Sequence, residues 1–249
     1  SLSLICDFVM PNWCSNKLFV KNLKTEDQDL LLRLFDQETF CESILPQPDW
    51  ANTPNEKGEL PLPAVLDEKH PELGRRFPDG TQDDRWYSWR NENWGTKWGE
   101  CDVSNPVVGS DGSFSVSYLT AWAPLNENFF KAFSQRFPGA RIAANYQESG
   151  CDFVGVTVAQ DGIVNDLNGC LSDLRDRWMR DTHPDLYERW EASRKDDYEG
   201  EDDEDELWEE LWDSWCEVES DVADAACAQL QALLEQSLEE KLQMLEEGV

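Results

Sequence analysis

Histidine and basic side chains are scarce in this sequence of 249 residues. It contains two histidines, His70 and His183, and 21 lysines and arginines against 52 acidic residues, so its formal net charge is -31. With only two histidines, which lie far apart in the sequence, a zinc site or a histidine-based catalytic dyad is not indicated. A strongly negative chain repels phosphate, which argues against generic binding of nucleic acid or of anionic membranes. We therefore expect no metal site and no direct contact with nucleic acid.

Long apolar runs, paired cysteines and catalytic motifs are also missing. No stretch approaches the run of about 18 apolar residues that indicates a membrane-spanning helix. The eight cysteines are scattered without a CxxC pair, which favours reduced thiols and a cytoplasmic location. No GxxxxGKS/T, GxSxG or HExxH motif occurs, and Cys14 with His70 is only a weak nucleophile–base candidate. We expect a protein that is not an enzyme, with no cofactor, catalytic residue or metal ligand.

The acidic residues are concentrated at the end of the chain. Residues 196–249 contain 21 acids and one base, Lys241, whereas the preceding 195 residues contain 31 acids and 20 bases. The net charges of the two parts are therefore -20 and -11. This asymmetry predicts a separate acidic C-terminal region.

The first part of the chain has the pattern of an α+β domain. Alternating apolar residues predict strands over residues 15–21, 114–118, 141–147 and 152–159, with a weak strand at 101–105. Helical periodicity predicts a helix that begins at an N-cap candidate, Thr25, and another over 124–137 that ends at Pro138-Gly139. Residues 46–84 are rich in Pro, Asp, Glu and Gly and are typical of a long loop. This order predicts a ferredoxin-like βαββαβ antiparallel sheet with helices on one face and an added edge strand.

The second part has the pattern of helices. We expect a helix over 167–195 that is interrupted at His183-Pro184, a second over 206–218, and a third over 221–247. The third repeats leucine at near-heptad spacing. The last two helices would pair as a hairpin or dock on the sheet domain. The repeating leucines are Leu230, Leu234, Leu238, Leu242 and Leu245.

Five ordered motifs resemble one known family. They are MPNWCSN at residues 10–16, NWGTKW at 93–98, TAWAP at 120–124, FPG at 137–139 and YQESG at 146–150. Together they resemble the Api-ninety-two-like family, over about residues 10–159. The resemblance implies a ferredoxin-like fold and a phage or plasmid origin, and it implies no catalytic residues. It also implies that MPNW is the start, so residues 1–9 would be a vector or upstream remnant.

These observations divide the chain into three parts. We expect the remnant at 1–9, a ferredoxin-like domain at 10–160 that includes a Trp-rich insertion at 46–100, and an acidic helical region at 161–249. The insertion contains a cluster of aromatic and basic residues, which is either a platform that stacks bases or sugars or a small satellite core. We favour the core, and we also expect Phe114, Val116 and Tyr118 to form a buried sheet face. The cluster comprises Trp86, Trp89, Arg90, Trp94, Lys97 and Trp98.

The acidic tract is the main candidate site. Residues 196–221 contain 15 acids and no base, so a helix would carry one charge per roughly 2.6 Å, close to the spacing in nucleic acid. The alternative is a solvated acidic linker and helix face, but disordered acidic tails are poor in aromatics, and this tract contains three tryptophans. The tryptophans would either hold the helix on its own domain or anchor a partner. The candidate residues are Glu201, Asp202, Asp203, Glu204, Asp205, Glu206, Glu209, Glu210, Asp213, Glu217, Trp208, Trp212 and Trp215.

Two functional hypotheses follow. The first is a non-enzymatic inhibitor from a mobile element, acting in the cytoplasm of a bacterial host. Its acidic surface would mimic nucleic acid and bind a basic host protein or ribonucleoprotein complex, with a CRISPR effector as the first candidate. The second is a structural or regulatory accessory protein that assembles through a seam of its C-terminal leucines. The sequence does not identify the target or the oligomeric state.

Overall fold

The computed structural model describes residues 12–62, 74–195 and 201–247, with the side chains of all of these except 193–195, 201–208 and 246. The expected remnant at 1–9 lies outside this part. The strands are β1 (Trp13–Lys21), β2 (Val107–Val108), β3 (Phe114–Ala121), β4 (Arg141–Glu148), β5 (Phe153–Gln160) and β6 (Ile163–Gly169). The helices are α1 (Thr25–Asp36), α2 (Phe40–Ile44), α3 (Arg85–Asn93), α4 (Glu127–Arg136), α5 (Leu171–Thr182), α6 (Pro184–Lys195) and α7 (Glu201–Glu247).

The strands form one antiparallel sheet in the order β2-β3-β1-β4-β5-β6. The order β4-β1-β3-β2 is that of a ferredoxin-like βαββαβ unit, and β5 and β6 extend it beyond β4. The predicted α+β fold is therefore confirmed. The weak strand expected at 101–105 is reduced to a single bridge between Cys101 and Leu119, and the edge strand follows it at β2.

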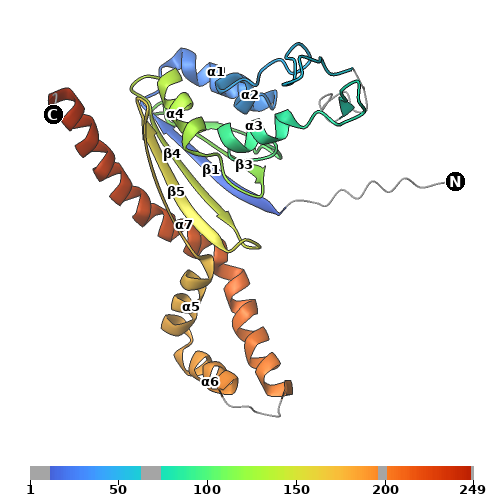
Figure 1. Ribbon diagram of the computed structural model, residues 1–249. Helices are drawn as coiled ribbons and strands as arrows, with labels where there is room; N and C mark the ends of the chain where they lie inside the picture. Colours follow the sequence, from blue (N-terminus) through green and yellow to red (C-terminus); the bar gives the residue numbers. More distant parts are fainter. Residues whose placement is uncertain (1–11, 63–73, 196–200, 248–249) are drawn as a thin grey trace.

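One face of the sheet is covered by α1, α2, α3 and α4 (Figure 1). Alternation along β1 and β3 turns every second side chain toward these helices, among them Leu18 and Tyr118. α4 begins where the Asn126 side chain accepts a hydrogen bond from the Phe129 backbone N–H at 3.1 Å. α1 is present, but Thr25 is its first helical residue, so the prediction of Thr25 as the N-cap is wrong. The N-cap residue is Lys24, which makes no side-chain capping bond. Phe114, Val116 and Tyr118 lie in this core, so the expectation of a buried face is confirmed.

The opposite face carries α7, which passes behind β5 in Figure 1. Val154, Val156 and Val158 of β5 pack there against Cys227 and other residues of α7. α7 is a single helix of 47 residues. The two helices expected at 206–218 and 221–247, and the hairpin between them, are therefore wrong, because residues 217–221 contain neither glycine nor proline to stop the helix.

The sheet continues past residue 160, where we expected the ferredoxin-like domain to end. β6 pairs with β5 along its whole length: Ile163 lies opposite Gln160 at one end, and Gly169 lies opposite Val154 at the other. The turn between them is Asp161-Gly162, whose φ angles of 51° and 85° are the positive pair of a type I′ hairpin. The helix expected from Leu167 therefore begins at Leu171 instead, whereas the break at His183-Pro184 is where α5 ends and α6 begins.

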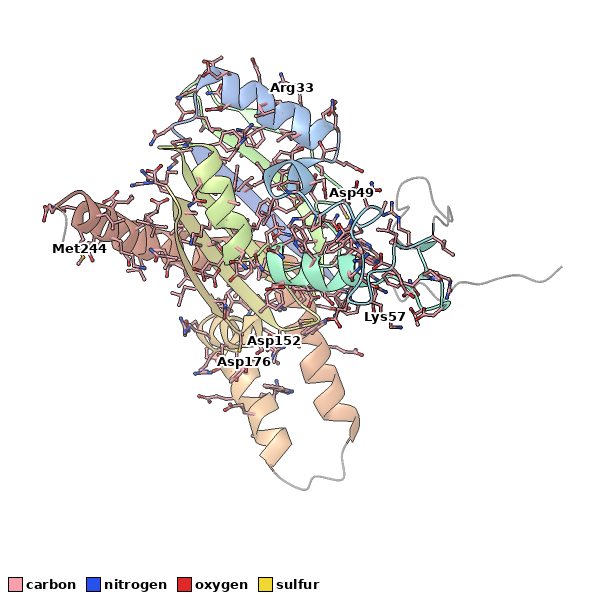
Figure 2. The ribbon with its side chains drawn as sticks, turned by 45° about the horizontal axis from the view of Figure 1, so that its top comes forward. Arg33, Asp49, Lys57, Asp152, Asp176 and Met244 are labelled. Carbon is pink, nitrogen blue, oxygen red and sulfur yellow. The ribbon has the colours of Figure 1, made fainter. Side chains whose placement is uncertain are left out.

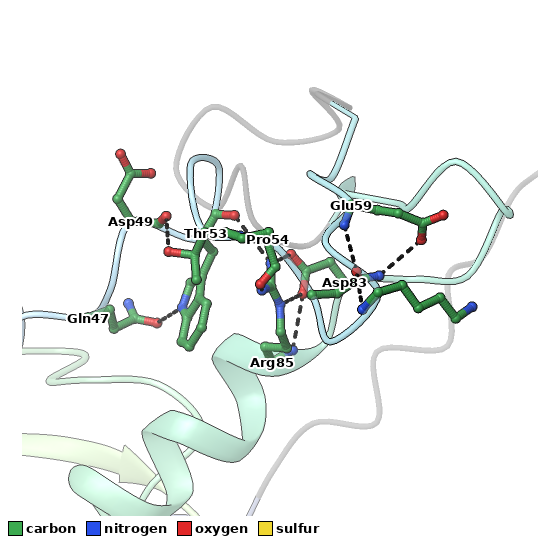
Figure 3. Close-up of polar contacts among 10 residues, drawn as sticks. Gln47, Asp49, Thr53, Pro54, Glu59, Asp83 and Arg85 are labelled. Carbon is green, nitrogen blue, oxygen red and sulfur yellow. Dashed lines mark hydrogen bonds and ion pairs between the residues drawn. The ribbon is translucent and has the colours of Figure 1, made fainter.

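The described part of the insertion is organised around Arg85 at the start of α3 (Figure 3). Its guanidinium donates to both carboxylate oxygens of Asp83, at 2.7 and 2.8 Å, and to the Pro54 carbonyl at 3.0 Å. It also lies 5.1 Å from the ring centroids of Trp50 and of Phe77. Cation–π contacts and a paired, nearly buried Asp83 hold the loops on α3.

Candidate functional site

The acidic tract belongs to a helical arm that extends from one end of the sheet (Figure 1). We define the helical arm as α5, α6 and the residues of α7 up to Val218. Its interior contains Met179, Tyr187 and Leu211, all nearly or fully buried. The rings of Trp178 and Trp215 lie 5.8 Å apart, and those of Tyr187 and Trp190 lie 5.5 Å apart. The arm is thus a packed three-helix unit with an aromatic core of its own.

Hydrogen bonds and ion pairs fix the base of the arm to the sheet. The Asp152 carboxylate, in the turn between β4 and β5, accepts bonds from the backbone N–H and the hydroxyl of Ser172, each at 2.6 Å. These bonds satisfy the first turn of α5, next to which Figure 2 places Asp152. Just beyond the arm, the Ser149 hydroxyl donates to Glu219 of α7, and Lys17 of β1 forms an ion pair with Asp224. Contacts at two of its helices hold the arm in a defined direction.

The acids of α7 in the arm point away from its core. Glu209, Glu210, Asp213 and Glu217 are all exposed. At about 100° per residue they fall within about 100° of the helix circumference, opposite the buried Trp215. Slight burial of the Cys216 thiol on this helix, followed by the nearby carboxylates of Glu219 and Asp213, raises its pKa.

Part of the predicted acidic site lies outside the described side chains. α7 includes the backbone of residues 201–208, but the side chains of the six acids from Glu201 to Glu206 and of Trp208 are not described. The site can therefore be built from four of its ten acids, and the first six remain a prediction.

The described tryptophans of the tract differ in their surroundings. Trp215 is 1% exposed and packs on Trp178, so it holds α7 in the arm and is not available to a partner. Trp212 is 39% exposed, and the guanidinium of Arg175 lies 5.8 Å from its ring centroid. Arg175 also forms an ion pair with Asp176 at 2.9 Å. The sequence did not single out Arg175, because only the fold brings α5 against α7.

Most of the leucines considered for an intermolecular seam pack within the chain itself. Leu238 is fully buried, and Leu230, Leu234 and Leu242 pack in the same cluster against the sheet. The near-heptad stripe is therefore the face by which α7 docks on its own domain, which was the other expected outcome. Leu245 is 66% exposed at the end of α7, close to Met244, which Figure 2 shows at the far end of the helix.

Half of the Trp-rich cluster in the insertion is buried. Trp86, Arg90 and Trp94 are 7% exposed or less, and the Arg90 guanidinium lies 5.0 Å from the centroids of both rings. The Trp94 indole N–H donates to the Leu45 carbonyl at 2.9 Å. Three of the six residues are thus enclosed, as a core role predicts. Trp94 belongs to the main core of the domain, however, and not to a separate satellite core. The half-buried members are Trp89, Lys97 and Trp98.

The buried cysteines are poor nucleophiles. Burial raises the pKa of Cys14 to about 12, and burial followed by the nearby Glu100 raises that of Cys41 well above its usual range. His183 lies beside Trp178, whereas His70, the proposed partner of Cys14, is outside the described residues. Among the described residues, no group of three or more His, Cys, Asp or Glu side chains could hold a metal ion. No helix in that part of the chain is long and apolar enough to cross a membrane.

Residues 93–182, from the end of α3 to the end of α5, match the family model of the ferredoxin-like domain in Api92-like protein. This stretch of the chain is similar to the ferredoxin-like domain of Api92-like proteins. The resemblance inferred from the sequence motifs is thereby confirmed for this domain. The Api92-like match ends before α6 and α7, so the acidic helix lies outside it.

A solved relative and the curated proteins add little about function. The crystal structure of a protein api92 from Yersinia pseudotuberculosis superimposes with a TM-score of 0.40 and 11% sequence identity. The superposition covers 64% of this chain and 98% of that one. No curated protein matches the chain. The family model supports the ferredoxin-like fold. The function has to be argued from this chain's own surface.

Proposed function

We propose that this protein is a non-enzymatic binding protein whose helical arm presents an acidic face to a basic partner. The observation that carries the proposal is the separation of the two sides of α7 in the arm. Leu211 and Trp215 are enclosed, whereas Glu209, Glu210 and Asp213 face solvent. A packed helix holds carboxylates at fixed spacing, and this lowers the entropy cost of binding relative to a flexible acidic tail.

The partner chemistry follows from the sign and spacing of these charges. From residue 196 to 240 the chain contains no lysine or arginine, so the part of α7 that lies in the arm carries no basic side chain of its own. Channels that hold nucleic acid are lined with Lys and Arg side chains, which pair with phosphates and equally with carboxylates. We propose that the arm occupies such a channel in a host nucleic-acid-handling complex. A CRISPR effector is the first candidate, and the host a bacterium that carries a phage or plasmid encoding this chain.

The partner is identified by capture from lysate with a matched pair of variants. The test variant replaces the described acids of the arm: Glu209→Gln, Glu210→Gln, Asp213→Asn and Glu217→Gln. The control variant makes the same change in net charge at exposed acids elsewhere: Asp29→Asn, Asp36→Asn, Glu56→Gln and Glu92→Gln. A basic, nucleic-acid-handling complex should be captured by the intact chain and by the control, and lost with the test variant.

Kinetics then separate a steered acidic interface from a nonspecific one. Association should be fast at low salt and slow steeply as salt rises, because exposed charges act over about 10 Å and are screened. The arm variant should lose on-rate at low salt, whereas the control should keep it. Equal capture by both variants, or a captured complex without a basic surface, would refute the proposal and leave the acids as a solvated helix face.

A further inference from the structure

α7 covers only half of its face of the sheet. Ala143 of β4 and the three valines of β5 lie beneath it. On β1 the side chains alternate, so that Leu18 and Val20 enter the core under α1 and α4 while Phe19 points to the α7 side, where it is 37% exposed. We call the uncovered part, among the described residues, the open half-face. It comprises Phe19 and Lys21 of β1 and Ser115, Ser117 and Leu119 of β3. Ser15 and Lys17 form its border with α7, where Lys17 pairs with Asp224.

The open half-face is unlike the rest of this acidic molecule. The strands β1, β2 and β3 contain no Asp or Glu, and Lys17 and Lys21 lie on this side. A cavity of about 150 Å³ opens between Phe19, Ser115 and Val107, and Val107 is 59% exposed. Exposed apolar side chains next to lysines indicate a surface for an acidic, partly apolar partner.

The outward face of α7 changes character where the helix leaves the arm. In the arm the exposed side chains are mostly acids, but the ten residues 225–234 carry no charge. The exposed positions recur at helical spacing, opposite the side that packs on the sheet, and Leu233 is 62% exposed. A solvated helix in this chain would be expected to carry charges on that side. The exposed uncharged residues are Ala225, Ala228, Gln229, Ala232, Leu233 and Gln236.

The charges that flank these two surfaces are spaced alike. Exposed Asp221 and Glu240 bracket the uncharged part of α7 and are about 28 Å apart along a helix. Lys21 lies at one end of β1 and Trp13 at the other, about 26 Å away along a strand. At the Trp13 end, Trp98 lies 6.3 Å from the Trp13 ring, and the Lys97 ammonium lies 4.5 Å from the Trp98 ring. A helix laid along β1 in either direction would therefore place one acidic end beside Lys21 and the other beside Lys97.

We propose that the open half-face binds α7 of a second copy of this chain, so that each copy covers the open half-face of the other. The contact continues an interface that already exists, because the same sheet face holds its own α7 and pairs Lys17 with Asp224. In a two-fold dimer the same patch is used twice. One reciprocal contact would therefore cover both the uncharged side of α7 and the exposed Phe19. The arms would remain free to bind the partner proposed above.

A second copy fits these observations better than a nucleic-acid strand does. Single-stranded nucleic acid would stack on Phe19 or Trp13 and pair with the lysines. It would, however, leave the uncharged side of α7 exposed, and the acids that bracket that side would repel its phosphates. A helix with acidic ends and an uncharged middle satisfies both surfaces.

The test is the mass of the full chain in solution, measured by light scattering and sedimentation over a range of concentrations. The intact chain should be a dimer. Phe19→Glu changes the open half-face and Ala232→Glu changes the helix side, and each should weaken dimerisation about tenfold or more, because each would bury an unpaired carboxylate. Leu60→Glu is the matched control, since Leu60 is 48% exposed on the insertion, away from both surfaces. It should leave the dimer intact.

Several results would overturn the proposal. An intact chain that stays monomeric at every concentration would do so, as would a dimer that neither variant weakens. A monomer that binds a labelled single-stranded oligonucleotide through Phe19 would replace the second copy with nucleic acid. Ala232 is exposed, so its variant should fold, and circular dichroism and thermal melting check both variants. The arm variant with four neutralised acids should still dimerise, which separates this test from that of the proposed function.

Discussion

The two faces of the sheet are built from different side chains. The face under α1, α2 and α4 is rich in phenylalanine. The Phe40 ring stacks 4.3 Å from that of Phe35 and meets the Phe133 ring edge to face at 5.1 Å. The face under α7 has Ala143 and valines of the sheet against aliphatic and small residues of α7, among them Leu238 and Cys227. Large rings bury more apolar area per residue than alanine and valine do. We therefore expect the first face to contribute more to the stability of the domain than the second face does.

The strongest way to break this comparison is to remove a ring from the first face. Phe133 is fully buried between Phe40 and Phe137, so Phe133→Ala should lower the free energy of unfolding by about 3–5 kcal/mol. Urea denaturation measures this loss, with Leu60→Ala as a surface control that should change it by about 0.5 kcal/mol or less. A loss below about 1 kcal/mol would show that the phenylalanine face does not dominate stability.

The next largest effect should be confined to the arm. Trp215→Ala removes a ring that is 1% exposed, at a cost of about 3 kcal/mol. Because the arm has its own core, hydrogen exchange should speed up in α5, α6 and the first part of α7. Exchange in β1, β3 and β4 should remain slow. Equal loss of protection across the sheet would mean that arm and sheet unfold as one unit.

A buried carboxyl on the first face makes stability depend on pH. Glu100 accepts hydrogen bonds from the backbone N–H groups of Phe40 and Cys41, but burial raises its pKa above the usual value. The folded state then binds more protons than the unfolded state between the two pKa values. Stability contributed by this group is therefore present below the unfolded pKa and is lost as pH rises through the folded one.

The Glu100→Gln variant isolates this contribution. Relative to it, the intact chain should lose unfolding free energy as pH rises from about 4.3 upward. Denaturation curves over a series of pH values measure the difference. Parallel pH profiles for the two proteins would show that the Glu100 pKa is not shifted by folding.

The smallest expected effect concerns the ion pair that joins α7 to the second face of the sheet. Lys17 and Asp224 join β1 to α7 with side chains that are 35% and 44% exposed. Exposed pairs contribute little, so a double-mutant cycle with Lys17→Gln and Asp224→Asn should give a coupling of about 0.2–1 kcal/mol. A coupling of several kcal/mol would mean that charges, rather than apolar packing, hold α7 on the sheet.

The sequence predicts the first face better than the second. Alternation in β1, β3, β4 and β5 and the helical pattern of α1 and α4 are local signals, and the structure confirms them. β6 was missed because Asn165, Asp166 and Asn168 are poor strand formers. The Asp161-Gly162 pair that opens it is nevertheless a strong hairpin signal and could have identified the strand.

Other features depended on contacts between distant residues. The split of α7 into two helices followed a change in composition, although no residue there breaks a helix. The candidate acids are exposed where they are described, as a charge run predicts. The roles of Trp215 and Trp212 could not be separated by sequence, because both lie on one stripe and only the position of α5 decides which is enclosed. Which members of the Trp-rich cluster are buried likewise depends on how the insertion packs, which the sequence does not show.

Because α7 is one unbroken helix, a movement at one of its ends is transmitted to the other. The helix is held on the sheet by its second half, and residues 201–218 extend roughly 27 Å beyond that support at 1.5 Å per residue. A tilt of about 5° at the sheet would move the far end of such a rod by roughly 2 Å. Conversely, a load on the arm acts as a torque on the contacts of α7 with β4, β5 and β6 and on its ion pair with β1. An event at the tip is therefore mechanically coupled to the surface of the sheet beside α7.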